Sequence, residues 1–375
     1  MPVPRLVALD LPPGRDFVLA MCRVWDDGDA VLPIDPRLPI SARVQLFRGL
    51  APEEIVRRDG VRDPIGRGGT HPPLRDGDAV VIPTSGTTGE PKGAIHTHAG
   101  LAAHAAAVHK RLDVDPERDR WLACLPLTHV GGFGVVARAL IDEVPLEVHP
   151  GFDALAVQAA AADGATLTSL VTTALDRIDP ASFRWVVLGG SADRSERPGN
   201  VVHTYGLTET GGGVVYDGTP LDGVEVRVDP DGQIAVRGAT LLRAYRDGTT
   251  PIDEVGWLRT GDIGQLDDGQ LRVDGRVGDL IITGGENVWP AVVEAALADA
   301  PGVAHVAVAS RADPEWGQRV VAFVVPAEGE PIPTLAALRE HAREQLPAFA
   351  APRELELLGE LPRTALGKVR RDHLT

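Results

Sequence analysis

The chain contains little cysteine and no long apolar segment, and both absences exclude whole classes of protein. Cys22 and Cys124 are the only cysteines among 375 residues. They can supply neither a four-thiolate zinc site nor a disulfide framework, so a reducing cytoplasm is the expected environment. No run approaches the roughly 18 consecutive apolar residues of a membrane span. Residues 1–5 begin no apolar signal segment, so secretion is not expected.

Positive charge is also in short supply. The chain has 37 Lys and Arg against 53 Asp and Glu, a formal net charge of −16. An acidic chain without a basic block is not expected to bind nucleic acid. Hydrophobic residues make up 43% and charged residues 24% of the chain, which is typical of a globular protein. At roughly 100–200 residues per domain, the length predicts two or three domains.

From residue 78 to about residue 215, apolar runs alternate with helical patterns. Residues 1–60 are predicted to form a short helix, a strand at 30–34 and a second helix, and residues 57–77 a surface loop. Such alternation predicts a mostly parallel α/β layer. The other elements expected here are strands at 79–82, 121–125, 146–149 and 185–188 and helices at 99–112 and 154–162.

The pattern changes after residue 220. Residues 224–236 are typical of a hairpin around the turn Asp229–Gly232, and residues 266–273 repeat that pattern. Beyond about residue 280, helical and strand patterns mix as in a separate α+β domain. The elements expected there are helices at 290–298 and 335–346 and strands at 303–309 and 320–325. The predicted fold class is therefore α/β, with a large N-terminal α/β domain, a small antiparallel β unit and a smaller mobile α+β domain.

The most specific motif is a stretch rich in Ser, Thr and Gly directly after the strand at 79–82. Small residues let backbone N–H groups approach a polyphosphate, hydroxyls add donors, and Lys92 supplies positive charge. It is not a Walker A loop, because the residue five after Gly86 is Pro91. A plain surface turn is the alternative interpretation. The candidate ATP- or AMP-binding residues here are Thr84, Ser85, Gly86, Thr87, Thr88, Gly89 and Lys92.

Four further motifs follow this loop along the chain. They are Tyr-Gly-Leu-Thr-Glu-Thr at 205–210, Gly-Trp-Leu-Arg-Thr-Gly-Asp at 256–262, Gly-Arg to Gly-Gly-Glu-Asn across 275–287, and Pro-Arg-Thr-Ala-Leu-Gly-Lys at 362–368. In this order the five motifs resemble those of the adenylate-forming superfamily of acyl-CoA synthetases, luciferases and peptide-synthetase adenylation domains. The resemblance covers roughly residues 78–375, and chance explains five collinear matches poorly. It implies an ATP- and acyl-binding domain at 1–277 and a mobile domain with a catalytic lysine at 278–375.

The resemblance also implies a nucleotide site, and the residue types suit it. Tyr205 offers a flat face for adenine, with Gly206 leaving room, and Glu209 is a hard oxygen ligand for Mg²⁺ on the ATP phosphates. Asp262 and Arg276 can hydrogen-bond the ribose. A core tyrosine is the alternative interpretation of Tyr205. Outside the family context, solvated charges would be the better interpretation of Glu209, Asp262 and Arg276. Thr208 joins Glu209 as a catalytic candidate, and Gly189 and Gly190 join the nucleotide site.

Lys368 is the residue expected to carry the chemistry. Transfer of an acyl carboxylate onto the α-phosphate builds negative charge on two groups, and a lysine between them stabilises that charge most in the transition state. A solvated tail lysine is the alternative. By resemblance, the C-terminal domain rotates at a hinge, Gly278 and Asp279, between adenylating and thioester-forming arrangements. The candidate coenzyme A channel then comprises Gly284, Gly285 and Glu286.

The acid substrate is expected to be compact, because few residues precede the phosphate loop. Leu32–Pro39 and the Gly-rich stretch 205–223 resemble most closely the short o-succinylbenzoate–CoA ligases of menaquinone biosynthesis. The candidate substrate-binding residues are His129, Gly131, Phe133, Ser191, Gly211 and Gly212. Another aryl- or acyl-CoA ligase and an adenylating enzyme with a non-CoA acceptor remain alternatives. A non-enzymatic nucleotide-binding protein is disfavoured, because Lys368, Glu209 and Asp262 are all present.

The expected small-molecule partners are the acid, ATP with Mg²⁺, and CoA as co-substrate, and a homodimer is the family-like expectation. His96, His98, His104 and His109 follow neither one helical face nor a zinc spacing, so no metal site is predicted from them.

Overall fold

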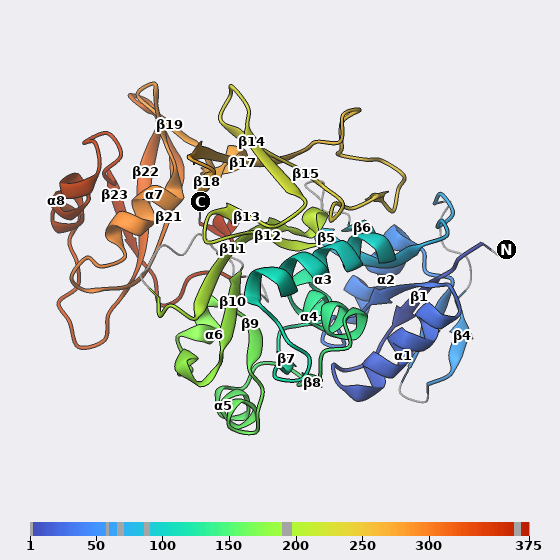
Figure 1. Cartoon of the computed structure of the whole chain (residues 1–375). Helices are drawn as coiled ribbons and strands as arrows, with labels where there is room; N and C mark the ends of the chain where they lie inside the picture. The colour runs from blue at the N-terminus through green and yellow to red at the C-terminus, as the bar shows by residue number, and fades with distance from the viewer. Residues whose placement is uncertain are drawn as a thin grey trace. The chain divides into compact units, whose positions relative to one another are not determined.

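Two compact units make up the chain in the computed structural model (Figure 1), which describes residues 3–57, 60–65, 71–85, 91–189, 197–363 and 369–374. The first unit comprises residues 1–189, 197–226 and 236–258, and the second comprises 190–196, 227–235 and 259–375. This division by contacts runs at residue 258, whereas the family hinge predicts a functional boundary at 277. That functional boundary stays a prediction.

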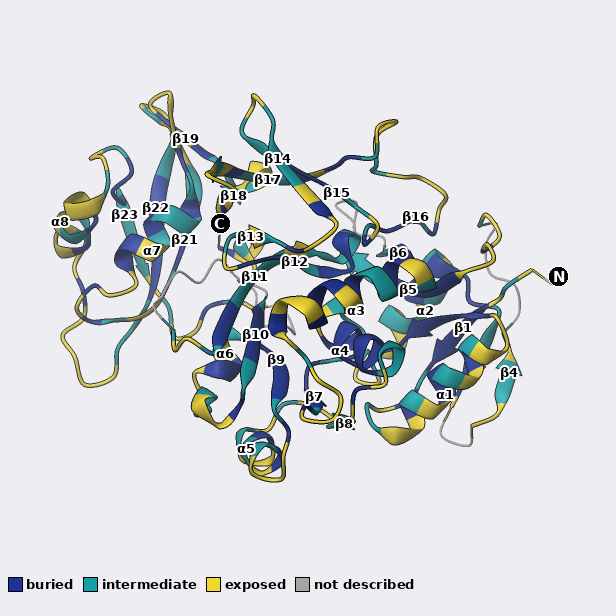
Figure 2. Cartoon of the chain, in the orientation of Figure 1, coloured by how far each residue is buried: buried dark blue, intermediate teal, exposed yellow. Residues whose placement is uncertain are grey.

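The first unit contains a seven-stranded sheet in the order β16-β6-β5-β2-β1-β3-β4. Its central strands β5, β2, β1 and β3 are parallel, and β4, β6 and β16 pair antiparallel at the edges. Every residue of β1 is buried (Figure 2), as expected for a strand covered on both faces. The strand bounds are β1 Leu6–Leu9, β2 Ala30–Pro33, β3 Glu54–Val56, β4 Arg62–Pro64, β5 Asp78–Ser85, β6 Pro91–Thr97 and β16 Ala244–Tyr245.

A second seven-stranded sheet in the same unit has the order β13-β12-β11-β10-β9-β7-β8. The strands from β8 to β11 are parallel, which confirms the predicted α/β layer, and β12 and β13 add antiparallel strands at one edge. The strand bounds are β7 Trp121–Ala123, β8 Leu146–Val148, β9 Leu167–Val171, β10 Trp185–Gly189, β11 Val201–Leu207, β12 Gly212–Tyr216 and β13 Thr219–Pro220.

Helices pack on both sheets of this unit. Helix α3 contacts β6 of the first sheet and also α4, and α4 contacts β7, β8, β9 and β12 of the second sheet (Figure 1). Thr97 caps α3, since its hydroxyl accepts a hydrogen bond from the Gly100 amide at 3.0 Å. The helix bounds are α1 Arg15–Asp26, α2 Ile40–Leu50, α3 His98–Leu112, α4 Val130–Ile141, α5 Ala154–Ala162 and α6 Thr172–Leu175, with 3₁₀ turns η1 Pro180–Ser182 and η2 Thr208–Thr210.

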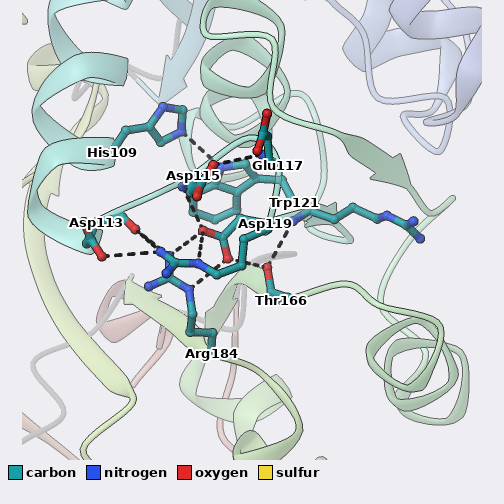
Figure 3. A network of polar contacts seen from close by, with 10 residues as sticks. His109, Asp113, Asp115, Glu117, Asp119, Trp121, Thr166 and Arg184 are labelled. Atoms are coloured by element: carbon teal, nitrogen blue, oxygen red, sulfur yellow. Dashed lines mark hydrogen bonds and ion pairs between the residues drawn. The ribbon is translucent and has the colours of Figure 1, made fainter.

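A polar network closes the amino ends of three parallel strands of the second sheet (Figure 3). Asp119 precedes β7, Thr166 precedes β9 and Arg184 precedes β10. The Arg184 guanidinium donates to both Asp119 oxygens, at 2.8 and 2.6 Å, and the Thr166 hydroxyl donates to the same carboxylate at 2.9 Å. Burial alone would raise the pKa of Asp119, but these hydrogen bonds outweigh it and lower that pKa. The network therefore ties these three strands together at their amino ends, opposite to their carboxyl ends.

The second unit combines a hairpin with a mixed sheet. Strand β17 pairs antiparallel with β18, and β21 pairs with β22 along nearly its whole length. Helices α7 and α8 pack on each other, and α7 covers β21. The bounds are β17 Leu258–Asp267, β18 Gln270–Arg276, η3 Val277–Asp279, β19 Ile281–Thr283, β20 Glu286–Val288, α7 Pro290–Leu297, β21 Val303–Asp313, β22 Gly317–Pro326, α8 Leu335–Gln345, β23 Glu354–Leu357 and η4 Arg371–His373.

Strands β14 (Val224–Val228) and β15 (Gln233–Gly238) are sheet neighbours, as the predicted hairpin requires. Two predictions for the N-terminal region were wrong. Residues 6–9 form a strand that precedes the first helix, and residues 62–64 form strand β4 inside the stretch assigned to a surface loop. Among the described residues, no helix is both long and apolar enough to cross a membrane.

Candidate active site

Strands β5 and β6 pair antiparallel on either side of the predicted phosphate loop. Strand β5 runs to Ser85 and β6 begins at Pro91, so Thr84, Ser85 and Lys92 lie in strands and not in the loop to which the sequence assigned them. Thr84 pairs with Lys92, and the Thr84 hydroxyl donates to the Lys92 carbonyl at 3.3 Å. Residues 86–90, which include the predicted Gly86, Thr87, Thr88 and Gly89, lie outside the described residues. The pairing of β5 with β6 fixes the backbone positions of residues 85 and 91, on either side of this stretch.

Glu209 lies in the 3₁₀ turn η2 between β11 and β12, and its carboxylate is oriented by a residue that the sequence analysis missed. The hydroxyl of Tyr245, in strand β16, donates to Glu209 Oε1 at 2.9 Å. The Lys92 ammonium lies over the Tyr245 ring, 5.1 Å from its centroid, a distance typical of a cation–π contact. One tyrosine thus brings together a cation from the phosphate-loop hairpin and the anion predicted to bind metal.

The backbone around Glu209 is held by two buried histidines. His96 of β6 donates through Nε2 to the Thr208 carbonyl at 2.8 Å, and His104 of α3 donates to the Gly213 carbonyl at 3.0 Å. Burial lowers the pKa of His96 to about 4 and that of His104 to about 3. Both imidazoles are therefore neutral near pH 7. The sequence offered no signal for this pairing, because a strand and a helix bring the two rings to one segment.

Gly206 is required by backbone packing. A Cβ at this position would lie 1.9 Å from the Gly212 carbonyl oxygen, closer than any real contact. The sequence analysis assigned this glycine to leaving room for adenine, and the structure shows that it makes room first for the neighbouring strand. Tyr205 beside it is half-buried on β11. Its stacking role stays a prediction, as does the catalytic role of Thr208.

The predicted acyl pocket begins at the start of α4. His129 immediately precedes this helix, and burial lowers its pKa, while the nearby Asp35 carboxylate raises it and the Arg37 guanidinium lowers it. Gly131 is exposed. Phe133, in contrast, is 1% exposed and lies edge-on to Trp25, with centroids 6.4 Å apart. Phe133 therefore packs against Trp25 in the core, and its contact with substrate stays a prediction.

Asp262 and Arg276 are paired in the second unit. They face each other across the β17–β18 ladder, and Arg276 Nε lies 3.7 Å from Asp262 Oδ1. Asp262 is 8% exposed, and its amide donates to the Thr260 hydroxyl at 3.1 Å. Two residues chosen from separate motifs are therefore neighbours, as binding to one ribose requires. That ribose role itself stays a prediction.

The hinge and channel candidates follow Arg276 closely in the sequence of the second unit. Gly278 and Asp279 form turn η3, and Arg371 Nη1 donates to the Asp279 carboxylate at 3.2 Å. A side chain at Gly278 would meet open space, so this backbone does not require glycine. Gly284 and Gly285 have φ of +60° and +83° and form the turn between β19 and β20, with exposed Glu286 after it.

Six predicted site residues remain, and three of them lie within the described residues. Gly189 ends β10, and Gly211 and Gly212 have φ of +76° and +129° beside Glu209. Gly190, Ser191 and Lys368 lie outside the described residues. The segment that contains Lys368 is flanked by a β-bridge between Arg363 and Val369.

The donor set fits a metal that arrives with a nucleotide better than a resident metal ion. Within the described ranges, no group of three or more His, Cys, Asp and Glu side chains could hold a metal. Mg²⁺ usually takes one or two carboxylates, with phosphate oxygens and waters completing its coordination. Glu209 supplies one such carboxylate, and the Tyr245 hydrogen bond occupies only its Oε1.

Two family models match most of the chain. The model described as AMP-binding enzyme matches residues 41–246, and the AMP-binding enzyme C-terminal domain matches residues 292–368. Lys92, Glu209 and Tyr245 lie within the first range, and helix α8 and strands β21, β22 and β23 lie within the second. The chain belongs to the AMP-binding enzyme family.

Its relatives sharpen this assignment. The chain is 44% identical over 324 residues to a probable 2-succinylbenzoate–CoA ligase of Mycobacterium tuberculosis, covering 80% of this chain and 84% of that protein. It is 35% identical over 367 residues to an indoleacetate–CoA ligase of Aromatoleum aromaticum, covering 85% and 70% respectively.

One solved structure extends the likeness to the fold. The o-succinylbenzoate CoA synthetase of Bacillus subtilis, in complex with its acyl-adenylate intermediate, matches with a TM-score of 0.84 at 26% identity over 99% of this chain and 88% of that one. The same enzyme in complex with ATP and magnesium matches with a TM-score of 0.83.

Proposed function

We propose that this protein is an AMP-forming acid–CoA ligase that converts o-succinylbenzoate, ATP and CoA into o-succinylbenzoyl-CoA, AMP and diphosphate. The observation that carries the proposal is the arrangement around Tyr245. Lys92 of β6 and the Glu209 carboxylate both contact Tyr245, and a cation beside a carboxylate suits the binding of a metal-bound polyphosphate. The 44% identity to a probable 2-succinylbenzoate–CoA ligase supports the choice of acid.

In the first step, a carboxylate oxygen of the acid attacks the α-phosphorus of ATP. The new acyl oxygen–phosphorus bond forms as the bond to the pyrophosphate oxygen breaks, and pyrophosphate leaves. Lys92 and residues 86–89 would hold the phosphates, and Glu209 would hold Mg²⁺, which would neutralise phosphate charge. Lys368 stabilises the charge on the acyl carboxylate and the α-phosphate, which is greatest in the transition state.

In the second step, the CoA sulfur attacks the acyl carbon. The thioester bond forms, the acyl–oxygen bond to AMP breaks, AMP leaves, and the thiol proton passes to water. No protein nucleophile is needed. The turn at Gly284–Gly285 and the neighbouring Glu286 would line the path of the CoA arm after rotation at Gly278 and Asp279.

The use of ATP and CoA supports a cytoplasmic location, where both are abundant, and the scarcity of cysteine agrees with it. A homodimer stays a prediction from the family likeness. Another aryl acid is the second candidate substrate, because the indoleacetate–CoA ligase is 35% identical.

The test is mass spectrometry of reactions that contain enzyme, Mg·ATP, CoA and one acid from a panel with o-succinylbenzoate and indoleacetate. We expect a new thioester with o-succinylbenzoate and AMP formed in equal amount. Turnover only with another acid would reject the substrate and keep the chemistry. Acyl-AMP without any thioester would indicate a different acceptor, and no adenylate with any acid would reject the function.

A further inference from the structure

Two buried histidines outside all the recognised motifs contact the segment that carries Glu209. We propose that His96 and His104 are positioning residues, which clamp residues 208–213 from both ends and thereby fix the Glu209 carboxylate where Mg·ATP needs it. The inference rests on the proposed role of Glu209 as the metal-binding carboxylate.

The clamp is formed by direct hydrogen bonds on either side of Glu209. His96 Nε2 donates to the carbonyl of Thr208, the residue before Glu209, at 2.8 Å. His104 Nε2 donates to the carbonyl of Gly213, four residues after it, at 3.0 Å. His96 and His104 are 1% and 3% exposed. Because packing restrains both rings, the two carbonyls have little freedom to move.

The segment between these bonds has little rigidity of its own. Gly211 and Gly212 adopt φ of +76° and +129°, and glycine has more backbone freedom than any other residue. A Cβ at Gly211 would lie 3.7 Å from His96 Cε1, and one at Gly212 would lie 3.2 Å from His104 Cε1. The imidazoles thus fill the space that the glycines leave, so they restrain the turn by contact as well as by hydrogen bonding.

The hydrogen bonds also define the tautomer. A carbonyl can only accept, so Nε2 carries the proton on each ring. In His96 this leaves Nδ1 as a buried atom without a hydrogen-bond partner among the described residues. Such an atom is costly to bury, whereas an apolar side chain in its place would leave the Thr208 carbonyl without this donor. The burial of His96 despite this cost is consistent with a role in fixing residues 208–213.

The experiment separates the hydrogen bond from the volume of the ring. In His96→Gln and His104→Gln the amide nitrogen falls at the Nε2 position and can still donate, whereas His96→Leu and His104→Leu keep bulk without a donor. His109→Leu is the matched control. His109 is also buried on α3, but it bonds Asp142 at 2.6 Å and Trp121 at 3.1 Å instead of this segment.

The readout is the affinity of the full-length protein for ATP, measured by calorimetry with Mg²⁺ and again with EDTA, beside thermal unfolding of each variant. We expect each leucine variant to lose about tenfold of the Mg²⁺-dependent gain in ATP affinity, the scale of one lost hydrogen bond. Affinity in EDTA should stay unchanged. The glutamine variants should recover to within about threefold of wild type. His109→Leu should unfold at a lower temperature yet keep its Mg²⁺ dependence.

Leucine variants that are folded and bind Mg·ATP as tightly as wild type would overturn the clamp. If they do not fold, His96→Asn and His104→Asn replace them, because the shorter amide cannot reach the carbonyl, and wild-type Mg²⁺ dependence in these would overturn it equally. Glu209→Gln separates the two levels. If Glu209→Gln loses the Mg²⁺ dependence and the histidine variants keep it, only the clamp is rejected. If Glu209→Gln keeps the wild-type Mg²⁺ dependence, the role of Glu209 is rejected and the clamp with it.

Discussion

Lowering the pH from 7 to 5 should destabilise the first unit through His104. Its imidazole is buried against the Gly213 carbonyl, and burial lowers its pKa from 6.5 to about 3. The positive charge of Arg138 on α4 disfavours its protonation further, and His96 on β6 and His109 on α3 add to this effect only when they are themselves protonated. Between these two pKa values, His104 is therefore protonated in the unfolded chain and neutral in the folded chain. Stability from this group is fully present above pH 6.5 and is lost as the pH falls toward 3.

The size of the effect follows from these two pKa values. At pH 5 the unfolded imidazole is almost fully protonated and the folded one is neutral. Proton linkage then gives a loss of about 2 kcal/mol between pH 7 and pH 5 from His104 alone. Most unfolded carboxyl groups titrate near pH 4, below this window. His104→Gln keeps a donor to the Gly213 carbonyl but cannot titrate, so it isolates the effect.

The assay is urea unfolding of wild type and His104→Gln at pH 7 and at pH 5. After equilibration, a brief hydrogen-exchange pulse at one common pH reports on peptides from β10 and β11, which belong to the first unit. With a urea m-value of about 3 kcal/mol per molar, the wild-type midpoint should fall by about 0.7 M more than that of the variant. Equal falls in the two proteins would refute the reasoning, because His104 would then not be a neutral buried group.

Three further outcomes follow from the site. Lys368→Ala should abolish acyl-AMP formation, measured as pyrophosphate release, and should spare thioester formation from supplied acyl-AMP. Equal loss of both half-reactions would contradict this division. Tyr245→Phe should raise the Mg·ATP concentration for half-maximal rate by about three- to tenfold with little change in unfolding temperature, because the hydrogen bond to Glu209 is lost while the ring is kept. Gly206→Ala should cost about 3 kcal/mol or more of stability in chemical denaturation, since its Cβ would lie 1.9 Å from a backbone oxygen. Gly199→Ala, whose Cβ would meet nothing within 4 Å, is its control and should unfold as wild type does.

Local patterns predicted most of the elements, and tertiary contacts explain the exceptions. The helix at 154–162 was predicted to the residue, because a run of alanines begins after a capping aspartate, Asp153. Strand β1 was missed because four apolar residues have too little length to show a period. Strand β4, Arg62–Pro64, was missed because it carries no apolar pattern and exists only by pairing with β3.

The candidate site likewise contains residues that local motifs predicted and residues that only tertiary contacts bring into it. Asp262 and Arg276 were found because motifs name them, and the β17–β18 ladder brings them together. Tyr245 is a lone tyrosine between charged residues, with nothing local to mark it. His96 and His104 lack metal spacing, and nothing in their local sequence marks them either. Their actual role depends on a helix and a strand that lie far from residue 209 in sequence, which no local pattern encodes.

The Asp119 network separates two tasks within the second sheet. Its hydrogen bonds to Arg184 and Thr166 stabilise the amino ends of β7, β9 and β10, while the segments after the carboxyl ends of β7 and β10 lead to the candidate substrate residues. Those distal segments can therefore be exchanged between homologues to alter acid preference without disturbing this network. The sheet can therefore serve as a stable scaffold for redesign. Libraries that vary residues 125–131 and 189–191 should retain folded protein more often than libraries that vary Asp119 or Arg184.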